Sequence, residues 1–547
     1  MRIENDDFVI VFNGEIYNYQ ALRRELIQAG EDFFSAGDTE VVVRGFKMFG
    51  LQWLKRLNGM FAAAIWDKQK QKLTLFRDRF GIKPLYWTVV NGNAAFASQI
   101  NSLLRFPGLS PRLNLDWLNE YLSFQYAHGN ITPFEGVYLL ERGKALVFET
   151  GSTRPSEVTW APERTYTPAR ALSEEQATEL ILEQFNNAVR NALTSDVTVG
   201  SYLSGGIDSG AVVTVASRYE ESLNTFTCGF NDPELSEHGR SLDETERART
   251  VASLVGARFH EIRIAPRDIM EMHERVLETI EEPRVGVMYQ NDSAARLASS
   301  NVSVCLSGAG GDELFGGYPW RYRTIRSAGS RAEFLGGYFG FWQRVFSEEE
   351  KKRFLKPEVL KSTDINRPME AFSKQFPESF DYAEIGARTW LCLKYESEFF
   401  LHGLLQIGDR LAGAYGMEER FPFLDNALVE LVDRIPAQYH WDPDEAAENG
   451  QFHSGKRLLR AALARIVDPL VASLPKQGFT IPVHEWFAGP LSAFVDERLA
   501  SKDAKLLEYF NPDIVEHARA SNESGRSVSA AQIWSLLSLE TMLKTFF

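Results

Sequence analysis

Two glycine-rich segments in the second half of the chain each carry an aspartate. The first, Ser204–Ser209, has the sequence Ser-Gly-Gly-Ile-Asp-Ser, and the second, Ser307–Glu313, has the sequence Ser-Gly-Ala-Gly-Gly-Asp-Glu. Glycines let backbone N–H groups approach an anion closely, and the N-terminus of a following helix adds a favourable dipole. Both segments are therefore candidates for holding phosphate groups.

The first segment alone is ambiguous. No Lys-Ser or Lys-Thr pair follows at the Walker spacing, and an ordinary strand-to-helix turn also accounts for two glycines. The second segment favours the phosphate interpretation because apolar, strand-like runs precede both segments, at Val197–Leu203 and Val302–Leu306. Ligands bind at the carboxyl ends of strands in open parallel sheets. There, Asp208 and Asp312 would hold one Mg2+ between them and so neutralise the phosphates.

The surrounding pattern predicts the sheet that would position these segments. Strand-like runs at Thr225–Phe230 and Arg258–Ile264 alternate with helical segments, which favours a parallel, helix-covered α/β sheet. Ser173–Gln176 has the form of a capping box, and buried-type residues follow it at helical spacing. From about residue 325 onward the pattern is mainly helical.

The first half of the chain has short apolar runs separated by turn signals. The pairs Asn13–Gly14 and Asn91–Gly92 favour tight turns between strands, and a helix is expected near Tyr19–Ala29. A stretch with three prolines and little periodicity then predicts a linker. We expect a sheet-rich domain over 1–150, a linker over 151–172 and a second domain over 173–547.

Composition excludes several classes of protein. The net charge of -15 argues against a nucleic-acid binder, and 44% apolar with 24% charged residues is normal for a globular enzyme. No apolar run reaches the ~18 residues of a membrane span, and the start lacks a signal-peptide pattern. The three cysteines, Cys228, Cys305 and Cys392, have no CxxC spacing, so neither a zinc site nor a disulfide framework is indicated. We expect a cytoplasmic location.

A series of motifs in the family's order gives the chain a close resemblance to the glutamine-dependent asparagine synthetases. Besides Ser204–Ser209, these are Leu306–Tyr318, Glu418–Asp425, and the basic segments Gly455–Lys456 and Lys476–Phe479. The resemblance implies an ATP pyrophosphatase domain that cleaves ATP between its α and β phosphates, with ATP and Mg2+ as cofactors.

The resemblance also implies roles for individual residues. Leu203 and Cys228 would flank the adenine and ribose, with Cys228 acting through its backbone. Lys476 would meet the departing pyrophosphate, where a cation stabilises growing negative charge; a plain surface lysine is the alternative. The implied nucleotide-binding set is completed by Ser204, Gly205, Gly206, Asp208, Ser209, Ser307 and Gly308. For Glu418, Arg420 and Asp425 we favour a buried structural ion network over a substrate site.

The first half resembles the class II glutaminase domain of the same family, an Ntn-type α-β-β-α sandwich that would be incomplete here. The matching segments are Asn13–Asn18, Gly37–Glu40, Gly59–Asp67 and Arg77–Tyr86. By resemblance, the Asn13 side chain and the Gly14 N–H would form the oxyanion hole. Glu15 and Asp38 would hold the amino group of glutamine.

The nucleophile of such glutaminases, a cysteine at the mature N-terminus, has no counterpart. None of the twelve residues before Asn13 is Cys, Ser or Thr. We therefore do not expect the chain as given to hydrolyse glutamine, and the glutamine-binding residues would be vestigial. Two explanations stay open: the sequence starts at an internal Met of a longer gene, or the protein uses free ammonia or another amine.

The predicted reaction is ATP-dependent amidation of a small-molecule carboxylate through an acyl-adenylate, with aspartate to asparagine as the default and ammonia or an amine as donor. Position 309 is Ala, where well-studied asparagine synthetases carry Glu. This keeps open a tailoring amide ligase or cyclase similar to β-lactam synthetase. An alternative of another class is a non-catalytic scaffold on a decayed synthetase. A homodimer is left open, and no nucleic-acid or membrane partner is expected.

Overall fold

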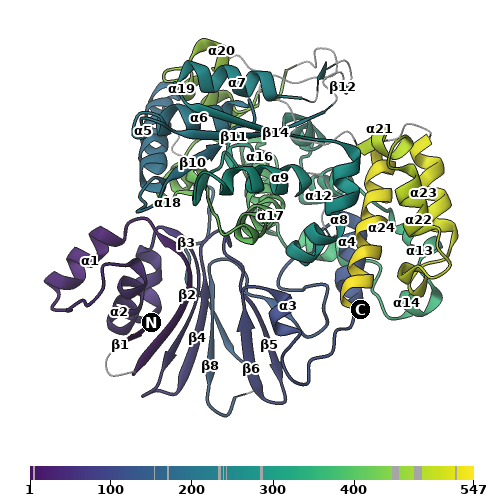
Figure 1. Cartoon of the computed structure of the whole chain (residues 1–547), viewed down its shortest axis with the longest axis horizontal. Coiled ribbons are helices and arrows are strands. Elements are labelled where there is room, and N and C mark those ends of the chain that lie inside the picture. Colours follow the sequence, from purple (N-terminus) through teal and green to yellow (C-terminus); the bar gives the residue numbers. More distant parts are fainter. Residues whose placement is uncertain are drawn as a thin grey trace. The chain divides into compact units, whose positions relative to one another are not determined.

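The computed structural model describes residues 1–3, 7–152, 154–168, 172–231, 236–237, 240–241, 243–283, 288–445, 455–472, 483–523 and 527–547. The chain forms two compact units (Figure 1). The first contains Met1–Leu113 and Gly129–Thr165, and the second contains Asn114–His128 and Tyr166–Phe547. Residues 114–128, which the sequence suggested for the first domain, therefore fold with the second unit.

The first unit contains a six-stranded antiparallel sheet in the order β1-β2-β3-β4-β8-β9. Its strands are β1 (Arg2–Ile3), β2 (Phe8–Ile16), β3 (Gly59–Asp67), β4 (Lys72–Arg77), β8 (Lys144–Glu149) and β9 (Ser156–Thr159). The edge strand β9 lies in the stretch that the prolines indicated as linker, and it pairs with β8. A second, three-stranded sheet has the order β6-β5-β7, with β5 at Tyr86–Val90, β6 at Asn93–Ala97 and β7 at Tyr138–Leu139.

Strand β3 separates two layers of core because its side chains alternate between the two faces of the sheet. Phe61, Ala63 and Ile65 pack in one apolar cluster with residues of α1 (Tyr19–Gln28) and α2 (Asp38–Phe49). Ala62 and Ala64 pack in another cluster, together with apolar residues of β5 and β6. The unit is thus layered as helices, sheet and sheet, and the short helix α3 (Ile100–Leu103) contacts β5 and β6.

Only one of the two Asn-Gly pairs forms the predicted turn. Asn91 and Gly92 take positive φ angles of 51° and 79° between β5 and β6, so the predicted tight turn is confirmed. The prediction of a turn at Asn13–Gly14 is wrong, because both residues lie inside β2. Gly14 serves close packing instead: a Cβ there would lie 2.1 Å from the carbonyl oxygen of Met60 on β3.

The second unit is built on a five-stranded parallel sheet in the order β14-β11-β10-β15-β16. Its strands are β10 (Val199–Tyr202), β11 (Asn224–Phe230), β14 (Arg258–Ile264), β15 (Val304–Leu306) and β16 (Glu418–Arg420). The first four confirm the sequence prediction of a parallel sheet. In Figure 1, α6 (Ile207–Ala216) and α7 (Thr245–Leu254) lie on one side of this sheet, with α9 (Met288–Ser299) and α17 (Leu401–Ala414) on the other.

The predicted capping box at Ser173 is confirmed at the start of α5 (Glu174–Ala192). The Ser173 hydroxyl accepts from the Gln176 N–H at 3.2 Å, and the Gln176 side chain accepts from the Ser173 N–H at 3.0 Å. Two short strands, β12 (Ser236–Glu237) and β13 (Arg240–Ser241), pair with each other.

Helices dominate the chain beyond residue 325, as predicted, although β16 adds a strand there. The second unit's other helices are α4 (Leu115–Phe124), α8 (Pro266–Ile280), α10 (Gly311–Phe315), α11 (Pro319–Tyr322), α12 (Arg331–Trp342), α13 (Glu348–Phe354), α14 (Pro357–Lys361), α15 (Arg367–Ser373), α16 (Ile385–Tyr395), α18 (Asn426–Val432), α19 (Arg457–Leu463), α20 (Pro469–Ala472), α21 (Val483–Ala488), α22 (Ser492–Leu499), α23 (Asp513–Glu523) and α24 (Ser527–Phe546). None of the helices among the described residues is long and apolar enough to cross a membrane.

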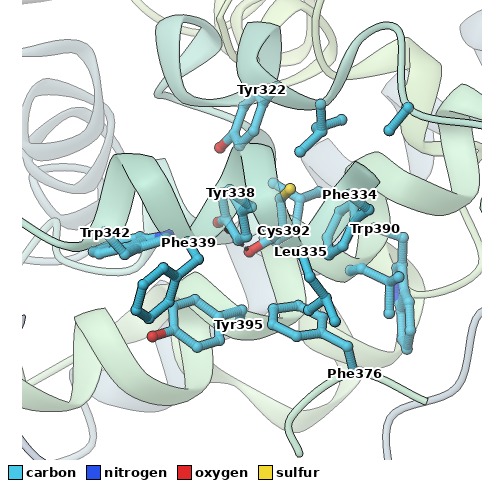
Figure 2. Close-up of a cluster of buried hydrophobic side chains, with 14 of the residues drawn as sticks. Tyr322, Phe334, Leu335, Tyr338, Phe339, Trp342, Phe376, Trp390, Cys392 and Tyr395 are labelled. Carbon is cyan, nitrogen blue, oxygen red and sulfur yellow. Dashed lines mark hydrogen bonds between the residues drawn. The ribbon is translucent and has the colours of Figure 1, made fainter. Parts of the chain in front are cut away.

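An aromatic cluster forms the core of the helical part (Figure 2). Tyr338 and Trp342 of α12 lie against Tyr395 of α16, and Tyr322 of α11 closes one side. These large side chains are almost completely buried. The cluster also includes Tyr318, whose hydroxyl donates to Glu313 at the end of the second glycine-rich segment.

Candidate active site

The two glycine-rich segments lie side by side at the carboxyl edge of the parallel sheet. Ser204–Ser209 connects β10 to α6, and Ser307–Gly310 connects β15 to α10. Because β10 and β15 are paired neighbours in a parallel sheet, both segments leave the sheet at the same edge. They touch there: a Cβ on Gly308 would lie 2.8 Å from the Ser209 nitrogen, and one on Gly311 would lie 2.7 Å from Asp208 Cγ.

The first segment is held in shape by its two serines. The Ser204 N–H donates to the Ser209 hydroxyl at 3.1 Å, and the Gly206 N–H donates to the Ser204 hydroxyl at 3.4 Å. Gly205 has a φ of 74°, and a Cβ there would also lie 2.9 Å from Arg247 Cβ, which explains the glycine. The segment thereby directs the N-terminus of the ten-residue helix α6 toward the edge of the sheet.

A lysine joins the two aspartates. The Lys456 ammonium donates to Asp208 Oδ2 and lies 2.7 Å from Asp312 Oδ1. Lys456 is only 2% exposed, whereas both carboxylates are 15% exposed. Burial lowers the pKa of Lys456, but the two carboxylates outweigh it and hold that pKa above its ordinary value. Gly455–Lys456 was identified in the sequence as a motif, but no role was predicted for Lys456. The contact with the two aspartates was therefore not predicted.

The donor set at this edge suits Mg2+. Two carboxylates already converge on one cation, and hard carboxylate oxygens are the ligands that Mg2+ prefers. Among the described residues, no group of three or more His, Cys, Asp or Glu side chains could hold a metal. Magnesium in phosphate-transferring sites is held by one or two carboxylates plus phosphate oxygens and water. Asp208 and Asp312 therefore fit a metal that arrives with a nucleotide.

Leu203 and Cys228 lie near each other where β10 and β11 end. The Leu203 N–H donates to the Phe226 carbonyl at 2.9 Å, and the Leu203 carbonyl accepts from the Thr227 hydroxyl at 2.6 Å. The Cys228 thiol is buried, and burial is the main cause that raises its pKa to about 12. Such a thiol is a poor nucleophile, which argues against a covalent role for this side chain.

Glu313 and Tyr318 form a buried pair behind the second segment, which the sequence did not reveal. The Tyr318 hydroxyl donates to Glu313 Oε1 at 2.6 Å. Burial and the neighbouring Asp312 raise the pKa of Glu313. The guanidinium of Arg321 stacks on the Tyr318 ring, with Cζ 3.6 Å from the ring centroid, and its Nη1 lies 3.4 Å from Glu396 Oε1.

This line of contacts ends in the aromatic cluster of Figure 2. Glu396 accepts from the hydroxyls of Tyr322 and Tyr338 at 2.9 and 3.0 Å. Since Tyr318, Tyr322 and Tyr338 are all buried, the charged groups between them are shielded from water. The second segment is therefore anchored through Glu313 by a polar network inside an apolar core.

Glu418, Arg420 and Asp425 hold structure together. The Arg420 Nε donates to Glu418 Oε1 at 2.6 Å, and its Nη1 donates to the Ala192 carbonyl at the end of α5 at 2.9 Å. Asp425 caps α18 by accepting from the Ala427 N–H at 3.0 Å. These contacts support the structural interpretation. The carbonyl of Arg420 also accepts from the Ser307 N–H at 2.8 Å, which fixes the start of the second segment.

Lys476, predicted to meet pyrophosphate, lies outside the described residues. The Ala309 N–H donates to the Ser307 hydroxyl at 3.3 Å, and the methyl side chain of Ala309 is partly exposed. Position 309 thus brings no acid to the edge where Asp208 and Asp312 lie.

The first unit brings Asp38 to the end of β2. The Ile16 N–H donates to Asp38 Oδ2 at 3.0 Å, which places this carboxylate beside the segment containing Asn13, Gly14 and Glu15. The Asn13 side-chain amide donates to the Ser98 hydroxyl at 3.3 Å. Burial is the largest influence on Asp38 and raises its pKa.

The Arg77–Tyr86 motif of this unit is structural at its start. The buried guanidinium of Arg77 donates to the carbonyls of Lys83 and Leu140 at 2.6 and 2.8 Å. Asp78, equally buried, accepts from the N–H groups of Ile82 and Lys83 at 3.0 Å each. The motif therefore folds the connection between β4 and β5 around two buried charges.

Comparison with known proteins finds a matching family model for each half of the chain. The asparagine synthase family model matches residues 180–544, and the glutamine amidotransferase domain model matches residues 1–160. Asparagine synthetase (glutamine-hydrolyzing) 1 of Bacillus subtilis is 28% identical over 98% of this chain and 85% of its own. A putative asparagine synthetase (glutamine-hydrolyzing) of Mycobacterium tuberculosis is 31% identical over 97% of this chain and 83% of its own.

The chain is also similar to a relative that is named an amidase and not an asparagine synthetase. Amidase chry2 of Gibberella zeae is 26% identical over 91% of this chain and 80% of its own. The family match covers the parallel sheet, both glycine-rich segments and Lys456. The chain therefore belongs to the asparagine synthase family of ATP-dependent ligases.

Proposed function

We propose that the second unit activates a carboxylate as its acyl-adenylate and then amidates it. A carboxylate oxygen attacks the α-phosphorus of ATP, and pyrophosphate leaves. Ammonia or an amine then attacks the acyl carbon, and AMP leaves with the attacking oxygen. One observation carries this proposal. Asp208 and Asp312 come from two different glycine-rich segments and converge on one cation, the Lys456 ammonium.

The residues have distinct roles in this proposal. Backbone N–H groups of Ser204–Ser209 and the N-terminus of α6 would bind phosphate oxygens. Leu203 and the backbone of Cys228 would flank the adenosine, and Ser307 and Gly308 would also line the nucleotide. Bound Mg2+ would neutralise the phosphates. Lys476 is proposed to stabilise the charge that grows on departing pyrophosphate.

Aspartate is the proposed default acceptor, with asparagine as product. A second candidate is a tailoring amide ligase or cyclase acting on another carboxylate. Two observations favour keeping it: Ala309 supplies no acid beside Asp312, and an amidase is among the relatives. The two candidates share the adenylation step and differ only in the substrates.

The nitrogen donor is proposed to be ammonia, supplied free or from glutamine. The residues Asn13, Gly14, Glu15 and Asp38 suit a glutamine site through their donors and carboxylates. Equal rates with ammonium and with glutamine would assign glutamine hydrolysis to this protein. Product with ammonium but not with glutamine would assign free ammonia.

The test is a pyrophosphate-release assay with ATP, Mg2+ and ammonium across a panel of carboxylates. Aspartate is predicted to release pyrophosphate and AMP in equal amounts and to yield asparagine. Release with another carboxylate only would replace the default by the tailoring candidate. Formation of ADP and phosphate instead would contradict adenylation altogether.

A further inference from the structure

Lys456 occupies a position that its sequence neighbourhood does not explain. Its ammonium lies between two carboxylates that come from different segments, with Asp208 248 residues away in the chain. A lysine at 2% exposure is unusual unless it is paired, and here it is paired twice. The ammonium is thus a resident cation between the two proposed metal ligands.

Two carboxylates face one ammonium at this point, and the guanidinium of Arg460 also interacts electrostatically with both of them. A divalent cation between the same carboxylates would neutralise them and leave the ammonium available. Phosphate oxygens beside the glycine-rich segments would be its natural new partners, because ammonium groups bind phosphate as point charges.

The backbone and a neighbouring glycine place the Lys456 side chain beside Asp312. Lys456 has a φ of 60° and directly precedes α19, and its N–H donates to the Gly316 carbonyl at 3.3 Å. A Cβ on Gly317 would lie 1.8 Å from Asp312 Oδ1 and 2.7 Å from Lys456 Cε. Only a glycine at 317 leaves space for the lysine side chain beside Asp312.

We propose that Lys456 is an exchangeable counter-ion: its ammonium neutralises Asp208 and Asp312 before substrates bind, and yields this position to the divalent cation when the nucleotide's phosphates arrive. The inference rests on the proposed metal role of these aspartates. Such an exchange makes metal binding and nucleotide binding mutually dependent. Without a nucleotide, the metal must displace the ammonium from the two aspartates while no phosphate is present to bind the ammonium.

The experiment measures Mn2+ binding by electron paramagnetic resonance, with and without α,β-methylene ATP, in the wild-type protein and in Lys456→Met. In the wild type, the ATP analogue is expected to tighten Mn2+ binding about tenfold or more. In Lys456→Met, Mn2+ without nucleotide is expected to bind about tenfold or more tightly than in the wild type, with less gained from the analogue. Mn2+ should also raise the unfolding temperature of the variant more than that of the wild type.

Lys351→Met is the matched control, because Lys351 is also buried and donates to the Asn119 side chain at 2.7 Å and to the Ser123 hydroxyl at 2.9 Å. It should leave Mn2+ affinity unchanged. If Lys456→Met folds only when Mn2+ is present, the metal has replaced the ammonium and the proposal stands. If it does not fold at all, Lys456→Arg decides: this variant keeps the cation and should bind nucleotide-free Mn2+ no more tightly than the wild type.

Two results would overturn the proposal. One is a Lys456→Met protein that binds Mn2+ without nucleotide no more tightly than the wild type. The other is a Lys456→Arg protein that binds it more tightly. Neither depends on turnover, so a failed pyrophosphate assay with the expected Mn2+ results would reject the proposed reaction and leave the exchange intact.

Discussion

Gly308 lies so close to Ser209 that a Cβ atom at position 308 would stand 2.8 Å from the Ser209 nitrogen and 3.1 Å from the Asp208 carbonyl carbon. The second glycine-rich segment therefore rests directly on the backbone of the first. Backbone atoms cannot yield as a flexible side chain can, so this contact sets the distance between the two segments. The relative position of Asp208 and Asp312 depends on it.

Gly308→Ala is expected to push the segments apart and to abolish most of the pyrophosphate release. Overpacking of this kind costs about 1–3 kcal/mol in stability. The matched control is Gly336→Ala within α12, where a Cβ meets nothing within 4 Å. That change should keep activity and stabilise the protein by about 0.5–1 kcal/mol. Equal activity in both variants would show that the segments need no close contact.

Asp208→Asn and Asp312→Asn are each expected to lower pyrophosphate release by roughly 10²-fold or more, because each removes a charge aimed at the proposed metal and its phosphates. Both variants should also weaken Mn2+ binding in the presence of nucleotide. Asp196→Asn, an exposed position before β10, serves as control and should match the wild type. Full activity in either site variant would remove that carboxylate from the site.

Cys228→Ala is expected to keep pyrophosphate release within about twofold, because a buried thiol with a pKa raised to about 12 stays protonated. The native protein should also resist alkylation at Cys228 by iodoacetamide at pH 8, as mass spectrometry of peptides would report. Loss of turnover in Cys228→Ala with an unchanged unfolding temperature would assign the side chain a direct role.

Stability is expected to fall in acid through His273. Its ring is buried, with Nδ1 2.7 Å from the Tyr289 hydroxyl and Nε2 3.0 Å from the Thr541 hydroxyl. Burial, and to a smaller extent Arg498, lowers its pKa from 6.5 to about 3 in the folded protein. Between these values the unfolded chain binds more protons, so stability is lost as pH falls through this range.

The cost is about 1.4 kcal/mol for each pH unit in that window. The measurement is the free energy of unfolding in urea at pH 6.5, 5.5 and 4.5, for the wild type and His273→Asn. The variant should start less stable, since it loses ring contacts, but its stability should decline less steeply with acid. Parallel declines in the two proteins would contradict a neutral buried His273.

Several features that depend on local sequence patterns were predicted correctly. The Ser173 capping box and strand β14 were predicted correctly because both depend on near neighbours: hydrogen bonds within one turn in the first case, a short strand-like run in the second. The approach of Asp208 to Asp312 was also predictable, since each follows a strand of one parallel sheet. Whether they bind metal stays a prediction.

Contacts between segments that are distant in the chain could not be predicted from the sequence. Nothing near Lys456 in the sequence indicates that its ammonium lies between two aspartates far away in the chain. The Glu313–Tyr318 pair is only five residues apart, but its burial depends on the whole aromatic cluster. Asn13–Gly14 failed as a turn because the same glycine signal also serves close strand packing. Residues 114–128 carry no local mark of the unit that they join.

The most direct measurement of the central claim follows the oxygen of the substrate. The protein is incubated with ATP, Mg2+, ammonium and the carboxylate that releases pyrophosphate, labelled with 18O in the reacting carboxyl group. An acyl-adenylate requires that one 18O atom pass from the carboxylate to each AMP, as mass spectrometry would show. Unlabelled AMP, or 18O found in inorganic phosphate instead, would contradict adenylation at this site.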